Sequence, residues 1–323
     1  MSEMSNWKKQ AEVLASTGLS WRKIAKTIGV PKSTVSDHLR EYFKQSEIEE
    51  TKADIFKIET SKSSKTFKDH VLIPDTQVKK GVALDHLRWA GEYCVEHKPE
   101  VIVHIGDHAD MPSLSSYDKG KRTAEGKRVN EDIEAAIKGM EVLLRPIYEE
   151  QQRELREYGK IKWKPRLVLT LGNHEERILR HVNANPELYG FLSIESLKYE
   201  EFGWEVYDFL EPVNVDGVTY CHYMANPFSG KPYGGSALNI LKHVGESFTM
   251  GHKQTLDVTT RFLPSSGKQQ WGIIAGAFYQ HDEGYKGPQG NKHWRGIIHK
   301  RRVVDGSYDP EIISMERLKY LYE

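Results

Sequence analysis

Side chains that can bind metal ions or move protons follow an apolar run near the middle of the chain. The apolar stretch 168–171 ends at Gly172, and Asn173, His174 and Glu175 come next. This pattern is typical of a buried strand that enters a loop and then a helix. Ligand sites of open α/β sheets lie at the carboxyl ends of such strands. We therefore expect these polar side chains to form part of a site.

Four other apolar stretches, each predicted to be a strand, are followed by polar side chains of the same kinds. Asp75 and Gln77 follow the stretch 71–73, and Asp107 and Asp110 follow 101–105. His222 lies on the outgoing arm of the stretch 213–223, and His252 and Gln254 follow 247–250. Five loops that deliver carboxylate, amide and imidazole groups suit a two-metal centre, in which one carboxylate bridges ions about 3.5–4 Å apart.

Composition narrows the class of protein. The chain has 323 residues, of which 38% are hydrophobic, enough for a sizeable core. Charged residues make up 28% and cancel to a formal net charge of zero, so any nucleic-acid affinity must come from a local patch. No apolar run approaches the roughly 18 residues of a membrane span. With only Cys94 and Cys221, read as reduced thiols, the sequence predicts a cytoplasmic protein without a membrane partner.

The first 45 residues predict three short helices. The first ends near Gly18, the second begins after Ser20, and the third begins at about Pro31 and runs to about residue 43. Gly29 allows a tight turn between the last two, which gives helix-turn-helix spacing. The apolar side chains that mark these helices are Trp7, Val13, Leu14, Trp21, Ile24, Ala25, Ile28, Val35 and Leu39.

The stretch 33–40 resembles the recognition helix of bacterial and phage helix-turn-helix domains. The resemblance implies DNA as a partner, with six side chains facing the major groove: Lys32, Ser33, Thr34, Ser36, Asp37 and Arg40. Residues 1–45 hold eight Lys/Arg and four Asp/Glu, which agrees with this interpretation. The alternative is a helical packing or oligomerisation module with a solvated basic face. The sequence leaves the subunit number open, a homodimer included.

The rest of the chain divides into a linker and one large domain. We predict a helix-turn-helix domain at 1–45, a linker at 46–66 that is rich in Glu, Lys, Ser and Thr, and a domain of alternating strands and helices at 67–323. Besides the strands already named, we expect helices at 83–97, 127–157 (bent or broken at Pro146), 174–183, 187–200 and 236–244, a hairpin at 213–223 around Asp216 and Gly217, and strands at 247–250, 256–262, 271–276 and 293–304.

The five polar motifs, taken in order, resemble those of the calcineurin-like metallophosphoesterases, in particular the DNA-repair nuclease branch. The resemblance covers roughly residues 67–280 and implies an α/β fold of four layers, a double β-sandwich flanked by helices. It implies that Asp107 bridges two metal ions, that Asp110 orients its neighbours without touching metal, and that His174 protonates the leaving oxygen or stabilises the phosphoryl oxygens. It assigns Asp75, Gln77 and Gln254 to the first ion and Asn173, His222 and His252 to the second.

The sequence departs from the family pattern at two positions. Gln77 and Gln254 stand where the family usually has histidine, and both belong to the same metal site. The resulting set of oxygen ligands favours Mn²⁺ or Mg²⁺ over Zn²⁺. Since a neutral amide is a weak ligand, two alternatives stay open: an active centre with two divalent ions, Mn²⁺ foremost, or a centre that is inactive or holds only one ion.

Three functions are therefore compatible with the sequence. The first is a metal-dependent phosphodiesterase or nuclease that the N-terminal module delivers to DNA, and that hydrolyses it with a water molecule activated between two ions. The second is a DNA-binding regulator or adaptor whose phosphoesterase domain is weak or inactive. The third is a phosphatase for phosphoproteins or small phosphomonoesters, against which the N-terminal module argues.

Overall fold

Three helices make up the described part of the N-terminal unit. The computed structural model describes residues 6–45 and 66–323, which divide into the units Met1–Lys65 and Thr66–Glu323. Helix α1 spans Asn6–Ser16, α2 spans Trp21–Ile28, and residues 32–45 are helical. Of the linker predicted at 46–66, all but the last residue lies outside the described residues.

The core of this unit follows the predicted spacing except in the first helix. Val35 and Leu39 are fully buried against Ile24, and Gly29 ends α2 with a φ of 70°. Val13, by contrast, is 64% exposed, and Ala11 is buried in α1 instead. Val13, which helped to predict this helix, lies outside the core, because a helical stripe that contains residues 7, 11 and 14 turns position 13 away.

Two mixed sheets form the framework of the larger unit. The first has the order β11-β10-β1-β2-β3-β4, with β1 to β4 parallel and β10 and β11 antiparallel. Its strands are β1 Lys68–Ile73, β2 Val101–His104, β3 Arg166–Thr170, β4 Glu205–Tyr207, β10 Gly296–Val304 and β11 Ser307–Ser314. The second has the order β5-β6-β7-β9-β8, built from β5 Val213–Val215, β6 Val218–Tyr220, β7 Phe248–Met250, β8 Leu256–Phe262 and β9 Gln269–Ala275.

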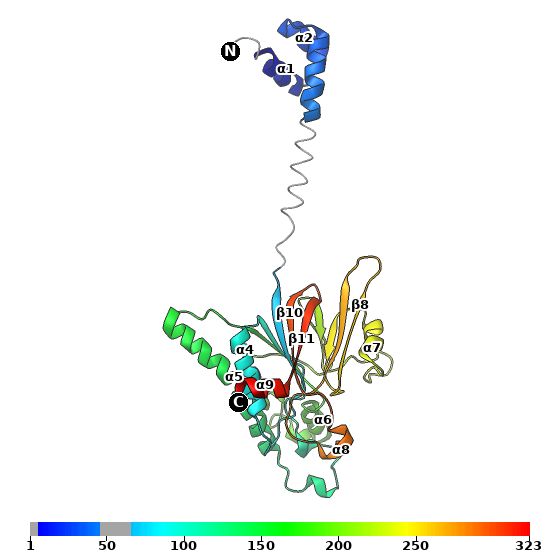
Figure 1. Ribbon diagram of the computed structural model, residues 1–323. Helices are drawn as coiled ribbons and strands as arrows, with labels where there is room; N and C mark the ends of the chain where they lie inside the picture. The colour runs from blue at the N-terminus through cyan, green and yellow to red at the C-terminus, as the bar shows by residue number, and fades with distance from the viewer. Residues whose placement is uncertain (1–5, 46–65) are drawn as a thin grey trace. The chain divides into compact units, whose positions relative to one another are not determined.

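The two sheets pack against each other through alternate side chains. Leu72 on β1 lies in one core with Tyr220 and Ile273 of the other sheet, whereas Val71 and Ile73 face helices. Figure 1 shows α4, α5 and α9 on the outer side of the first sheet and α7 beside the second. These helices span Asp85–His97, Val129–Tyr158, Met315–Tyr322 and Ala237–Val244 respectively. The predicted α/β class is confirmed, and the layers run helix, sheet, sheet, helix.

The helix predicted at 187–200 is absent, and the one predicted at 127–157 is present without a break at Pro146. Residues 187–200 do not form an α-helix: α6 spans Glu176–Ala184, and only the short turns Pro186–Leu188 and Ile194–Leu197 follow it. Gly190 (φ 85°) and Lys198 (φ 60°) interrupt the chain after each turn. Conversely, α5 continues through Pro146. Helix α4 packs closely against α5 near this proline. Gly91 on α4 permits the approach, since a Cβ there would lie 2.3 Å from the carbonyl oxygen of Leu143.

Two tight turns hold the ends of the sheets together. The predicted hairpin turns at Asp216 (φ 51°) and Gly217 (φ 88°), and a second one joins β10 to β11 at Asp305 and Gly306. A Cβ on Gly217 would lie 2.3 Å from the amide nitrogen of Gly306, so the two turns pack backbone to backbone.

Among the described helices, none has the length and apolar character needed to cross a membrane.

Candidate metal centre

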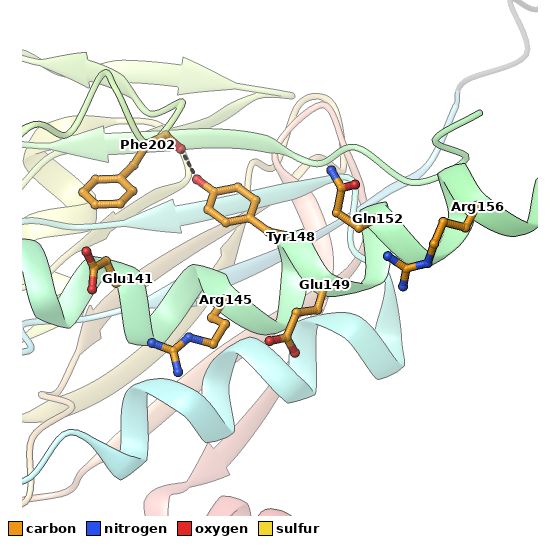
Figure 2. Close-up of a pocket in the computed structure, with 7 residues that line it drawn as sticks. All are labelled: Glu141, Arg145, Tyr148, Glu149, Gln152, Arg156 and Phe202. Atoms are coloured by element: carbon orange, nitrogen blue, oxygen red, sulfur yellow. Dashed lines mark hydrogen bonds between the residues drawn. The ribbon is translucent and has the colours of Figure 1, made fainter. Parts of the chain in front are cut away.

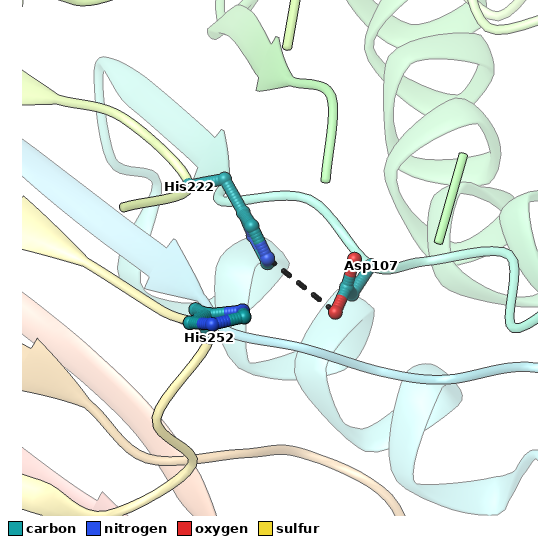
Figure 3. Close-up of side chains that lie close together, drawn as sticks. All are labelled: Asp107, His222 and His252. Atoms are coloured by element: carbon teal, nitrogen blue, oxygen red, sulfur yellow. Dashed lines mark ion pairs between the residues drawn. The ribbon is translucent and has the colours of Figure 1, made fainter. Parts of the chain in front are cut away.

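The predicted ligands lie in the loops that leave β1, β2, β3, β6 and β7. Atoms of Asp107, His222 and His252 that can bind metal lie within 4.8 Å of one another. Figure 3 shows the two imidazole rings beside the carboxylate, with His222 Nε2 3.4 Å from Asp107 Oδ2. The sequence separates these residues widely, and the carboxyl ends of the strands bring them together.

The imidazole half of the centre consists of Asn173, His222 and His252, and its polar atoms contact one another. Asn173 Oδ1 lies 2.7 Å from His252 Nδ1 and 3.0 Å from His222 Nε2. His222 Nδ1 donates to the carbonyl oxygen of Ile105 at 2.8 Å, which turns Nε2 toward the cluster. This half is therefore held in place by protein contacts alone.

The oxygen half consists of Asp75, Gln77 and Gln254, and its side chains are far less satisfied. Within the described part of the chain, Asp75 Oδ2 and both polar atoms of the Gln77 amide are buried without a hydrogen-bond partner. Buried polar atoms of this kind are rare in proteins and call for an explanation such as a bound ion. Two orphaned groups beside Asp107 thus fit a divalent cation with oxygen ligands.

The pKa values of the carboxyl groups also distinguish the oxygen half from the shared Asp107. Burial raises the pKa of Asp75 to about 7, and the charge of Asp107 adds to this rise. Burial also raises the pKa of Asp107, but His174 and His222 outweigh it and hold that pKa below its usual range. In return, Asp107 overcomes burial and raises the pKa of His222 to about 9. A cation near Asp75 would favour its ionised form.

Glycine and left-handed backbone allow the loops to approach so closely. A Cβ on Gly172 would lie 2.1 Å from Asp107 Oδ1, and one on Gly251 would lie 2.3 Å from Asp75 Oδ1. Four predicted ligands have positive φ angles: 42° at Gln77, 51° at Asp107, 64° at His252 and 57° at Gln254. Such strain in residues other than glycine clusters at functional sites.

A second group of side chains surrounds His174. Its Nδ1 lies 2.7 Å from Asp110 Oδ1, and its Nε2 lies 3.7 Å from Asp107 Oδ2. Arg177, one helical turn after His174, contacts His174 Nε2 at 3.1 Å and donates to the carbonyl oxygen of Asp110 at 2.7 Å. Burial lowers the pKa of His174, but Asp107 and Asp110 outweigh it and raise the net value.

Glu175 does not have the role that its side chain suggested. The sequence placed it among the groups able to bind metal or move protons, yet its carboxylate accepts backbone N–H groups from Asp107 (3.0 Å), Ala109 (2.8 Å) and Gly172 (2.9 Å). Tyr199 donates to it as well, at 3.2 Å. Glu175 therefore ties the loop after β2 to the loop after β3.

The residues predicted to contact DNA lie on the third helix of the N-terminal unit. Lys32, Ser33, Thr34, Asp37 and Arg40 are exposed, and Ser36 is half-buried. Val35 and Leu39 occupy the opposite, buried face. The helix therefore presents the predicted side chains to solvent, and contact with DNA stays a prediction.

The described part of the larger unit has several hollows on its surface. A cleft of about 700 Å³ opens beside Asp110 and Arg177, and Lys79, Tyr117 and Lys127 are also among its lining residues. A second hollow of about 450 Å³ lies along α5 (Figure 2), where Tyr148 donates to the carbonyl oxygen of Phe202 at 2.7 Å. Of these two, only the first adjoins the metal centre.

Comparison with known proteins adds little. No family model matches the chain, and no curated protein is similar to it in sequence. One solved crystal structure is similar with a TM-score of 0.37 and 12% sequence identity, over 77% of this chain and 100% of the other. Similarity this low supports neither a family nor a function.

Proposed function

We propose that the unit Thr66–Glu323 is a divalent-metal-dependent phosphoesterase of the calcineurin-like metallophosphoesterase type. The observation that supports this most is the approach of Asp107, His222 and His252 to within 4.8 Å, beside the bonded pair His174 and Asp110. Metal ligands next to a buried, oriented histidine are the groups that phosphoester hydrolysis requires.

Two ions fit this arrangement of side chains. Asp107 would be shared, with the imidazole half on one side and the oxygen half on the other. We propose Mn²⁺ for both, with Mg²⁺ or another transition metal as alternatives, because carboxylate and amide oxygens suit hard cations. When bound, such ions would neutralise phosphate charge and lower the pKa of a water molecule.

His174 is positioned to act on the leaving group. Since the carboxylate of Asp110 accepts the Nδ1 proton, the ring is fixed with Nε2 toward Asp107. Nε2 can then donate a proton to the departing oxygen. In the structure that nitrogen accepts from Arg177, because a guanidinium can only donate, so Arg177 must turn away before Nε2 can transfer a proton; its planar N–H groups suit two phosphoryl oxygens.

We further propose that the substrate is a DNA phosphodiester. The support is the exposed polar face of the third helix, which suits a major groove. The fusion of the two units would then deliver the hydrolytic centre to its polymer.

Hydrolysis of a chromogenic phosphodiester with Mn²⁺ tests the activity. We expect turnover by the full chain and a loss of about 10³-fold in Asp107→Asn, equivalent to about 4 kcal/mol of transition-state stabilisation. Asp309→Asn, an exposed carboxylate on β11, is the matched control and should retain activity. Equal activity in Asp107→Asn and the control would refute the proposal.

The DNA step needs a separate experiment. A chain that begins at residue 67 should cleave DNA less well than the full chain at moderate salt, and the difference should shrink at low salt. Tight binding of duplex DNA without turnover in any divalent ion would favour the alternative of a DNA-binding regulator or adaptor. The best support for that alternative is that Gln77 and Gln254 are weak metal ligands. Activity confined to phosphomonoesters would favour the phosphatase.

A further inference from the structure

Gln254 in the oxygen half is bonded to a side chain from a distant part of the chain. The hydroxyl of Tyr279 lies 2.8 Å from Gln254 Oε1, and Lys286 Nζ lies 2.9 Å from the same hydroxyl. Tyr279 is fully buried and Gln254 is 6% exposed, so this contact is shielded from solvent. The bonds form a chain of three side chains that ends at the metal centre.

The backbone explains how Tyr279 reaches this place. The amide of Gly276 donates to the carbonyl oxygen of Thr255 at 3.1 Å, and the amide of Phe278 donates to that of Asp75 at 2.8 Å. The segment after β9 thus runs between the loops that carry Gln254 and Asp75. Burial lowers the pKa of Lys286, and the charge of Asp75 opposes this, so the ammonium lies within electrostatic reach of the oxygen half.

The direction of these bonds follows from the donors available. A lysine ammonium can only donate, so the hydroxyl of Tyr279 accepts from Lys286 and its own proton is left for Gln254. A hydroxyl proton needs an acceptor, and in a glutamine amide only the oxygen accepts. The amide is therefore held with its oxygen toward Tyr279, and a carbonyl oxygen has a second lone pair for a cation.

We propose that Lys286 and Tyr279 are positioning residues, which orient the amide of Gln254 so that its oxygen rather than its NH₂ group is presented to the first metal ion. This deepens the proposed function, on which it rests. A histidine at position 254 would need no such orientation of an amide. We call the hydrogen-bonded series Lys286, Tyr279 and Gln254 the relay. It explains how a glutamine can serve as a metal ligand in the oxygen half.

A double-mutant cycle on the full chain separates orientation from packing. Tyr279→Phe removes the proton donor at nearly constant volume. We expect it to weaken the weaker of two Mn²⁺ sites by about 10-fold or more and to leave the tighter one unchanged. In a Gln254→Glu background, where either carboxylate oxygen can bind, the same change should alter affinity less than 2-fold. The concentration of free Mn²⁺ is measured from its electron paramagnetic resonance signal.

Three further variants complete the test. Lys286→Met should weaken the same site, Lys286→Arg should keep most of the affinity, and Tyr308→Phe, a buried tyrosine between the two sheets, should match the wild type. Equal loss from Tyr279→Phe in both backgrounds would overturn the proposal, because it would indicate packing alone. Tighter Mn²⁺ binding by Lys286→Met would also overturn it, because the ammonium would then occupy the place of the ion.

The relay and the proposed function fail in different ways. If the wild type hydrolyses phosphodiesters but binds a single Mn²⁺, the relay is wrong and the phosphoesterase stands. If it binds two Mn²⁺, and Tyr279→Phe weakens the weaker site only in the chain with Gln254, but no phosphoester is hydrolysed, the relay stands and the proposed activity is wrong. If it binds no Mn²⁺ and has no activity, both are wrong.

Discussion

The two halves of the candidate metal centre differ in how their side chains are held in the absence of an ion. In the imidazole half, Asn173 Oδ1 contacts both His222 and His252, so the side chains are arranged by one another. In the oxygen half, Asp75 Oδ2 and the Gln77 amide have no hydrogen-bond partner among the residues that the structure describes. Preorganised ligands lose little freedom when an ion binds, whereas unsatisfied buried groups raise the free energy of the ion-free protein. The imidazole half should therefore hold the tighter ion, since its ligands are preorganised and neutral amides are weak ligands, whereas an ion in the oxygen half should satisfy buried polar groups.

The largest difference between the halves should follow removal of one ligand from each. We expect His222→Ala to reduce the affinity of the tighter Mn²⁺ site by more than about 100-fold, since it removes a ligand rather than an outer partner of one. Gln77→Ala should affect only the weaker site. Calorimetric titration of the metal-free protein with Mn²⁺ checks this, and equal losses at both sites would contradict the division into halves.

Asp110→Asn should separate catalysis from metal binding. An amide can still contact His174 but no longer stabilises its charged form, so we expect phosphodiester hydrolysis to fall by between about 10- and 100-fold. Mn²⁺ stoichiometry should not change, because Asp110 contacts His174 and Lys79 rather than the ligands. Loss of an ion from this variant would place Asp110 within the centre itself.

The double substitution Gln77→His with Gln254→His should make the halves more alike. Imidazole nitrogen is a softer ligand than amide oxygen, so the weaker site should shift toward Zn²⁺ over Mn²⁺ by roughly 10-fold. Competition between the two ions, measured by calorimetry, checks the shift. An unchanged preference would count against both glutamines as ligands.

The smallest effect on the centre should come from the N-terminal unit. We expect Arg40→Ala to weaken duplex DNA binding and to reduce the slope of log affinity against log salt by about 1 if Arg40 contacts a phosphate. Mn²⁺ affinity and hydrolysis of the small chromogenic diester should stay as in the wild type. A change in either would show that the two units act on one another.

The sequence predicted those features that depend on local patterns. Strand ends such as Gly172 with Asn173 combine an apolar run, a turn and polar side chains within a few residues, so their placement could be read directly. The helix expected at 187–200 failed, because apolar spacing there competes with breaks at Gly190 and Lys198. The close approach of α4 to α5 at Pro146 depends on Gly91, which lies far from Pro146 in the sequence and belongs to no local pattern around it.

Side chains that act on the ligands were harder to find than the ligands. Tyr279 reaches Gln254, and Lys286 reaches Tyr279, only because the segment after β9 passes between two loops. Arg177 follows His174 by one helical turn, so its spacing was visible, but its direction was not. For Glu175 the residue type suggested chemistry, whereas its three backbone partners depend on the distance between two loops.

Those three bonds to Glu175 have a consequence for the dynamics of the loops. Amide hydrogens of irregular segments usually exchange with water within seconds, yet those of Asp107, Ala109 and Gly172 end on one buried carboxylate. They can exchange only when both loops open together. Hydrogen exchange should therefore show these amides to be as slow as the flanking strands, so that the ligand loops open as one cooperative unit.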